Sequence, residues 1–217
     1  MEVVESDIST IEREFFCDVV EGEIVNLEKQ KEHFKEHIAT FTDYGNIKIL
    51  DFKKPDSSEY RIRFLFEEDY CRLHISGDLG DLIASNYNNM VYEKFSDFVN
   101  DVGYFESKID CHNRKIYVYD EDLARGELLE MAKKHDWLLY SDKYSYENDD
   151  EERLNNIIDD ILYDFDDGTG LGTKGYDELS DLEDDISEFV SDLGKKETGI
   201  LELYMLAFKL AKEQLDK

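Results

Sequence analysis

Two histidines four positions apart are the residues whose spacing points most directly to chemistry. The segment 33–37, HFKEH, matches the inverted zinc-protease pattern H-x-x-E-H. Histidines at this spacing can share one face of a helix and bind Zn²⁺ there. The run Glu28–Glu36 is charged like an exposed helix, however, and no second helix offers a convincing further ligand. We therefore expect exposed histidines flanking a core-facing Phe34, with a metal-dependent enzyme built on His33 and His37 as a weaker alternative.

Two further groups of residues fall short of a metal site. One combines residue types that bind zinc: Cys71, His74, Cys111 and His112. Positions 71 and 74 differ by an odd number, so on one strand their side chains point to opposite faces. The other group, DFDDG at Asp164–Gly168, fails the register of a calcium-binding loop. Because phosphate-binding, dinucleotide-binding and nucleophile motifs are also missing, we predict a protein that is not an enzyme, with no catalytic residues, no metal and no cofactor.

The acidic residues form the most informative pattern in the chain. There are 54 Asp and Glu residues against 25 Lys and Arg residues, which gives a net charge of −29. Between Asp142 and Asp192 the count is 19 acidic and 3 basic residues, a net charge of −16. Such a protein is repelled by nucleic acid and by anionic lipid, so it should bind neither nucleic acid nor membrane. Its natural partner is a basic protein surface.

Two predicted helices would display these carboxylates in rows. Beyond Tyr176 the acidic residues recur at steps of three and four, which places helix neighbours about 5–6 Å apart on one face. Successive phosphates of a nucleic-acid strand are roughly 6–7 Å apart, so such rows can imitate a phosphate backbone. An acidic face that serves only solubility is the alternative. The predicted partner-binding residues are Asp149, Asp150, Glu151, Glu152, Asp159, Asp160, Asp164, Asp177, Asp181, Asp184, Asp185, Glu188 and Asp192.

The elements that position these residues begin with a helix and a sheet. Residues 1–42 should be helical, because large apolar residues recur at spacings of seven, four and three from Leu27 to Phe41. Residues 46–76 then alternate with a period of two, which predicts an antiparallel β-meander with one buried face. Its strands should lie near Ile47–Ile49, Tyr60–Phe66 and Cys71–Ile75.

The outer face of that meander should carry a group of basic residues: Lys48, Arg61, Arg63 and Arg72. We expect an acidic helix of the same chain to cover this basic sheet face. If a partner covers it instead, the protein is a regulatory protein-interaction module that binds through the sheet.

Helical spacing of apolar residues predicts further helices at Tyr92–Asp101, Asp120–His135, Leu154–Phe165, Tyr176–Leu193 and Thr198–Lys217. The last is apolar around much of its circumference, so it should be buried in the core or in a homodimer interface. The expected fold class is α+β: an N-terminal helix, an antiparallel β-meander with flanking helices, and an acidic helical C-terminal region. The expected domains are an α+β core domain at 1–140 and an acidic helical region at 141–217, packed on or appended to the core.

The cysteines and the N-terminus indicate the cellular compartment. Cys17, Cys71 and Cys111 are odd in number and form no close pair, which favours a reducing cytosol. The N-terminus lacks the positive charge of a signal peptide, and no apolar run approaches the roughly 20 residues that span a bilayer. We therefore expect a cytoplasmic protein.

Several segments resemble an uncharacterised protein family found in phages and mobile elements of low-GC Gram-positive bacteria. The likeness covers roughly residues 44–130 and rests on Tyr44–Phe52, Tyr60–Phe64, Ile75–Gly80, Gly103–Lys108 and Tyr119–Arg125. It implies no catalytic residues. It does imply a genomic context in which small acidic inhibitors of host defence occur, including anti-CRISPR and anti-restriction proteins. Together with the acidity, it predicts an inhibitor of a host nucleic-acid-binding defence protein, a CRISPR effector first and a restriction-type enzyme second.

Overall fold

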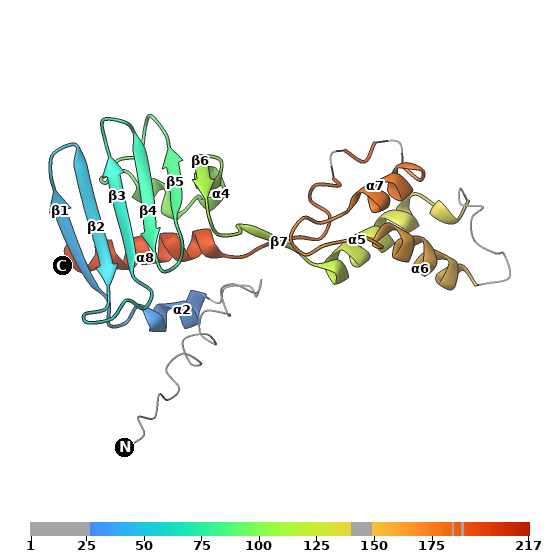
Figure 1. Cartoon of the computed structure of the whole chain (residues 1–217), viewed down its shortest axis with the longest axis horizontal. Helices are drawn as coiled ribbons and strands as arrows, with labels where there is room; N and C mark the ends of the chain where they lie inside the picture. Colours follow the sequence, from blue (N-terminus) through green and yellow to red (C-terminus); the bar gives the residue numbers. More distant parts are fainter. Residues whose placement is uncertain (1–26, 140–148, 184, 188) are drawn as a thin grey trace, which may run out of the picture. The chain divides into compact units, whose positions relative to one another are not determined.

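The computed structural model describes residues 27–139, 149–183, 185–187 and 189–217. The chain divides into two compact units, shown in Figure 1. Unit 1 comprises the chain up to Ile116 together with Thr198–Lys217, and unit 2 comprises Tyr117–Glu197. Unit 2 is thus an insertion in the sequence of unit 1. The expected domain boundary after residue 140 falls inside unit 2, and the last helix belongs to unit 1.

Unit 1 is built on a six-stranded antiparallel sheet whose strands follow one another in chain order. Side chains alternate across it: in β3, Ile62, Phe64 and Phe66 are fully buried, whereas Arg63 is exposed. This arrangement confirms the α+β class and the three predicted strands of the meander. The strands are β1 (Ile38–Asp43), β2 (Ile47–Lys53), β3 (Ile62–Glu67), β4 (Arg72–Gly77), β5 (Leu82–Ser85) and β6 (Ile109–His112).

The predicted N-terminal helix is wrong beyond His33. Helix α2 covers Leu27–His33, β1 begins at Ile38, and residues 1–26 lie outside the described chain. The helical spacing of apolar residues ran across the boundary between a helix and a strand. Phe34 is buried next to α2, whereas Ile38 is 54% exposed on the edge strand β1. The β-branched residues of β1 favour the strand. Strands β5 and β6 were not predicted, since β5 is short and β6 is largely exposed and carries no clear alternation.

Helix α8 (Ile200–Leu215) fills the buried face of this sheet, as Figure 1 shows. Phe208 is fully buried, and its ring centroid lies 5.4 Å from that of Phe64 and 4.8 Å from that of Phe95. The Tyr204 hydroxyl donates a hydrogen bond to the carbonyl oxygen of Leu79 at 2.9 Å, and burial raises the pKa of this phenol. The predicted last helix is confirmed, and its burial is accounted for within unit 1.

Two short helices complete unit 1. Helix α3 covers Ser96–Val99 and α4 covers Val102–Glu106, so the helix predicted at Tyr92–Asp101 is mostly turn. Their phenylalanines, Phe98 and Phe105, are fully buried. Beside α8, buried aromatic side chains of short helices and turns pack on the sheet, and Phe95 contacts both Phe105 and Phe208.

Unit 2 is mainly helical, and its core is aliphatic. Leu128, Ile158 and Leu179, from three different helices, are fully buried together. The helix predicted at Asp120–His135 is confirmed as α5, with those two residues as its caps. The helix predicted at Tyr176–Leu193 is wrong beyond Ser180, where turns follow. The elements are β7 (Tyr117–Tyr119), α5 (Glu121–Lys134), the 3-10 helix η1 (Trp137–Leu139), α6 (Asp150–Ile161), α7 (Thr173–Ser180) and β8 (Lys195–Glu197).

No helix within the described ranges is both long and apolar enough to cross a membrane. Cys71 and Cys111 are free thiols, and Cys17 lies outside the described residues.

Candidate acidic interface

The negative charge is concentrated in unit 2. Its 81 residues include 26 acidic and 8 basic residues, so it carries −18 of the total charge of −29. The two neighbouring β-strands β7 and β8 pair with each other, so the start and the end of this acidic insertion lie side by side. An excess of this size leaves most of its carboxylates without a cation from the same unit.

The predicted acidic row beyond Tyr176 does not form. Residues at steps of three and four share a face only while the helix continues, and α7 ends at Ser180. Asp181 is already the C-cap, and the chain then turns. Asp177, Asp181 and Asp185 are exposed, but no common helix face aligns them. Asp184 and Glu188 lie outside the described residues.

Helix α6 has an acidic face in two parts. Its buried stripe is Leu154, Ile157, Ile158 and Ile161. Glu151 and Glu152 are exposed in its first turn, Asp159 and Asp160 lie in its last turn, and two asparagines stand between the pairs. Seven residues of helix rise separate Glu152 from Asp159, about 10 Å. The prediction of a continuous row at phosphate spacing is therefore wrong here as well, and two separate acidic pairs take its place.

Two of the predicted binding residues cap helices. The Asp164 carboxylate accepts hydrogen bonds from the backbone N–H groups of Lys174 and Gly175, both at 2.9 Å, at the start of α7. These bonds hold the pKa of Asp164 below its usual value. Asp149 is the N-cap of α6 and accepts from the Glu152 N–H at 2.8 Å. Helix capping is a sufficient reason for an aspartate at positions 149 and 164, and it needs no binding to another protein.

Three other predicted residues pair with cations of unit 2. The pairs, with their N···O distances, are Asp159 with Arg125 at 2.7 Å, Asp192 with Lys195 at 2.9 Å and Asp150 with Arg153 at 3.3 Å. Such pairs at the surface contribute little to stability, on the order of 0–1 kcal/mol. Their charges are nevertheless partly neutralised.

Apart from the helix cap Asp149 and from Asp185, which accepts from the Ser187 hydroxyl at 3.1 Å, four of the predicted residues are exposed and have no cation among the described residues: Glu151, Glu152, Asp177 and Asp181. We call these four the acidic surface. Sequence reasoning missed further exposed acids on α5, namely Asp122 and Glu130. The helix that carries them was predicted. The acidic residues of its first turn were interpreted only as favourable for a helix N-terminus and not as binding residues. An acidic count extended upstream of Asp142 would have included Asp122 and Glu130.

The cations of the predicted basic sheet face are paired with carboxylates of unit 1, but the acidic helix expected to cover them is not found there among the described residues, and the arginines remain partly exposed. Arg63 donates to both carboxylate oxygens of Asp51, its partner in the β2–β3 register, at 2.7 and 2.9 Å. The predicted place on the outer face is wrong for Lys48, which stands opposite buried Phe66 in the β2–β3 register and therefore lies on the core side of the sheet. Its Nζ atom lies 2.7 Å from Glu93 and 3.3 Å from Glu68.

The other two cations of this face are also paired. Arg61 lies 3.2 Å from Asp78, and Arg72 lies 3.9 Å from Glu67. Each partner of the four cations comes from a strand or a turn of unit 1. The face is thus an alternating charged surface and not an uncompensated basic patch.

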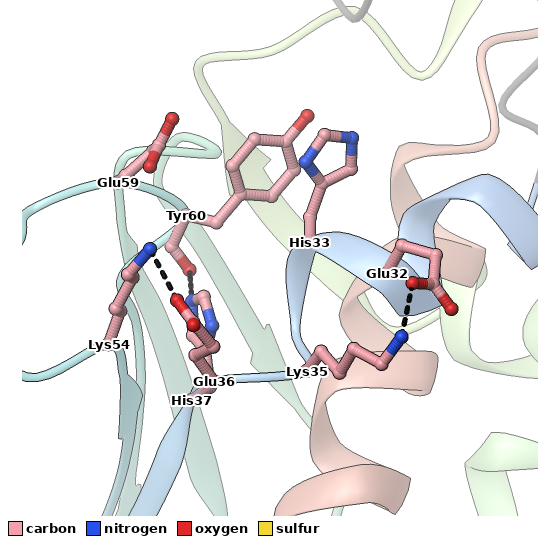
Figure 2. Close-up of a pocket in the computed structure, with 8 residues that line it drawn as sticks. All are labelled: Glu32, His33, Lys35, Glu36, His37, Lys54, Glu59 and Tyr60. Atoms are coloured by element: carbon pink, nitrogen blue, oxygen red, sulfur yellow. Dashed lines mark hydrogen bonds and ion pairs between the residues drawn. The ribbon is translucent and has the colours of Figure 1, made fainter.

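The two histidines of the HFKEH segment lie near one hollow of about 230 Å³, drawn in Figure 2. Because α2 ends at His33, His37 does not share a helix face with it. The His33 ring stacks on Tyr60 with centroids 4.6 Å apart. Lys54 pairs with Glu36, and Lys35 pairs with Glu32, at the rim.

His37 is buried, which contradicts the expectation that both histidines are exposed. It is 3% exposed, packs against Phe34 and Phe52, and donates from Nε2 to the carbonyl oxygen of Tyr60 at 3.2 Å. Burial lowers the pKa of this imidazole and favours its neutral form. The expected burial of Phe34 is confirmed.

The remaining metal candidates are not assembled either. One whole strand separates His74 from Cys111, because both stand opposite Ile83 of β5 in the register. Asp166 accepts from the Gly168 N–H and the Thr169 hydroxyl within its own turn. Across the described ranges, no three His, Cys, Asp or Glu side chains are grouped closely enough to hold a metal ion.

Comparisons with family models, with curated proteins and with solved structures find no match to this chain. The resemblance to a phage and mobile-element family therefore stays a prediction.

Proposed function

We propose that the protein is a non-enzymatic inhibitor that binds a basic nucleic-acid-binding protein through unit 2 and blocks its DNA or RNA groove. One observation carries this proposal: the 81 residues of unit 2 have a net charge of −18, and the four residues of its acidic surface are exposed with no cation among the residues that the structure describes. A surface of this charge attracts a lysine- and arginine-lined groove over a distance and speeds association with it.

The structure changes the form of the mimicry that we propose. The carboxylates do not follow one helical row, so the surface would offer separate negative groups in place of an evenly spaced phosphate backbone. Glu151 and Glu152 begin α6, while Asp177 and Asp181 lie at the end of α7. A groove that binds phosphates through several independent cations can accept such a pattern, since each contact is a local ion pair.

The class of partner rests on the resemblance and on charge. Phage and mobile-element inhibitors act inside the bacterial host, so the proposed site of action is the host cytoplasm. The proposed targets are CRISPR effectors and, second, restriction-type enzymes, because both hold nucleic acid in positively charged channels. The proposal does not require a homodimer or any cofactor.

The alternative of a module that binds through the basic sheet face has less support. Each of the three arginines of that face already has a carboxylate within 4.0 Å, and a partner would have to displace those pairs. The alternative of a metal enzyme on His33 and His37 also has less support, because one of them is buried and they share no helix face.

A competition assay tests the proposal. Purified CRISPR effectors and restriction enzymes from low-GC Gram-positive bacteria are each mixed with a labelled DNA or RNA substrate, and bound substrate is measured as the protein is added. We expect the protein to displace substrate from at least one of them, more weakly as salt rises. The acidic-surface variant carries Glu151→Gln, Glu152→Gln, Asp177→Asn and Asp181→Asn.

A charge-matched variant separates this surface from net charge. It neutralises four exposed acids of unit 1: Asp56→Asn, Asp97→Asn, Asp110→Asn and Glu213→Gln. We expect only the acidic-surface variant to lose competition. Equal competition by both variants would remove the acidic surface from the account, and no displacement from any target would count against the inhibitor class.

A further inference from the structure

Three connections of unit 1 meet at the same end of the sheet. In an antiparallel meander alternate turns lie at the same edge, so the β1–β2 turn, the β3–β4 turn and the segment after β5 are neighbours, as Figure 1 shows. Backbone bonds join them. The Glu68 N–H donates to the Asn46 carbonyl at 2.8 Å, and the Asn86 N–H donates to the Cys71 carbonyl at 3.0 Å.

Each of these connections exposes a tyrosine. Tyr44 is 68% exposed, Tyr70 is 69% exposed and Tyr87 is 93% exposed. Tyr104 of α4 lies beside them, because the Asn86 side-chain amide donates to its hydroxyl at 3.3 Å. We call Tyr44, Tyr70, Tyr87 and Tyr104 the tyrosine end. Large exposed side chains gathered on one edge mark an interaction surface more often than singly scattered ones do.

The backbone under the tyrosine end is fixed. Besides the bonds between turns, the Asp43 carboxylate accepts from the Gly45 N–H at 2.7 Å, and the Tyr104 ring stacks on buried Phe98 at 5.4 Å. A fixed backbone loses little further entropy on binding. Tyrosine adds a large contact area with only two side-chain torsions to fix, which is why tyrosine and asparagine are frequent in the binding loops of antibodies.

The charges at this end select the chemistry of the partner. Asp43, the last residue of β1, and Asp69, in the β3–β4 turn, are both exposed and directly precede Tyr44 and Tyr70 in the chain. Carboxylates there repel phosphate groups and so disfavour nucleic acid, although its bases could stack on the rings. The ring faces already accept cations within unit 1: the Lys108 ammonium lies 4.6 Å from the centroid of Tyr104, and the Arg72 guanidinium lies 6.0 Å from that of Tyr70.

We propose that the tyrosine end binds an arginine-bearing segment of a protein partner. A guanidinium group stacks on a tyrosine ring and at the same time donates a pair of hydrogen bonds to a carboxylate, as a lysine ammonium does not. Asp69 and Tyr70 are consecutive and exposed, as are Asp43 and Tyr44, so this end of the sheet contains a carboxylate and a ring for this combination twice. The inference is independent of the proposed function, because it concerns residues of unit 1 and not the acidic surface of unit 2.

Two synthetic peptides of equal charge test it, one with glycine, serine and three arginines and one with lysine at the same three positions. The tyrosine ring resonances of the isotope-labelled full chain are followed by nuclear magnetic resonance during titration near physiological salt. We expect the arginine peptide to shift the rings of Tyr44, Tyr70 and Tyr87 and to bind there about fivefold more tightly than the lysine peptide, as roughly 1 kcal/mol of added stacking implies.

A triple variant and a matched control complete the test. Tyr44→Ser with Tyr70→Ser and Tyr87→Ser should reduce arginine-peptide binding at Tyr104 to the level of the lysine peptide. Tyr163→Ser, which removes a tyrosine 71% exposed in unit 2, should leave the preference unchanged. Equal shifts with both peptides, or no shift at these rings, would overturn the inference. Stronger shifts with oligothymidylate would assign the surface to nucleic acid and also overturn it.

Discussion

At the scale of single residues, several ionisable groups whose types suggested binding or catalysis are committed to the fold. Asp164 caps α7 with both carboxylate oxygens, and His37 is enclosed by Phe34, Phe52 and the Tyr60 carbonyl. Both have pKa values below their usual values, for opposite reasons. Hydrogen bonds stabilise the charged carboxylate, whereas burial destabilises the charged imidazole.

His37 should make stability depend on pH. Its pKa is lower in the folded chain than the usual 6.5, so the unfolded chain binds more protons as the pH falls below that value. The neutral imidazole therefore favours folding above pH 6.5, and this contribution is lost as the pH falls towards the folded pKa. Relative to His37→Phe, which has no imidazole to protonate, wild type should have a lower thermal midpoint at pH 5.5 than at pH 7.5. A difference between the two proteins that stays the same at both pH values would contradict this role of His37.

Asp164→Asn should destabilise unit 2, because an amide accepts less strongly from the two N–H groups that begin α7. The urea midpoint should fall further than for Asp177→Asn, an exposed position at which no partner is found among the described residues. The gap between the two variants should close as the pH falls through the lowered pKa of Asp164, since the carboxylate then becomes neutral. Equal midpoints at neutral pH would contradict the capping role.

At the scale of elements, helices and strands could be predicted where the apolar residues of a segment keep one period. They could not be predicted where a turn or a second element interrupts that period. The alternation of β3 and the helical spacing of α5, α6 and α8 identified those elements, and the predicted bounds of α5 coincide with its two caps. The failures share a cause. Acidic and apolar spacing beyond Tyr176 resembles a helix, but turns interrupt it after Ser180, and spacing alone does not show an interruption. The pairing of Arg63 with Asp51 depends on strand register, which a single sequence leaves open.

Helix α8 should be the main source of stability in unit 1. Phe208 is fully buried among aromatic rings of the sheet and of the segment before α3. Phe208→Ala should lower the free energy of unfolding by about 3–5 kcal/mol through lost burial and the cavity left behind. Lys209→Ala, next in the same helix and exposed, should change it by less than about 0.5 kcal/mol. Chemical denaturation followed by circular dichroism measures both, and similar losses would contradict the assigned core.

At the scale of the whole molecule, composition indicated more than any motif did. The net charge of −29 was visible at once, but its division between two units follows from the insertion of 117–197 into unit 1, which no local pattern reveals. Like charges at this density repel one another, and added salt screens them. The thermal midpoint should therefore rise as sodium chloride increases from about 0.01 to 0.15 M, with a control of an uncharged solute at equal osmolality. A midpoint that falls with salt would show that attractive pairs dominate.

The central claim is that particular carboxylates of unit 2, and not acidity in general, bind a basic groove. The most direct test is the dissociation constant of the displaced target for two variants that lose the same four charges. The account predicts that the acidic-surface variant, at Glu151, Glu152, Asp177 and Asp181, binds at least about tenfold more weakly than the charge-matched variant of unit 1. Equal dissociation constants for the two variants would contradict it.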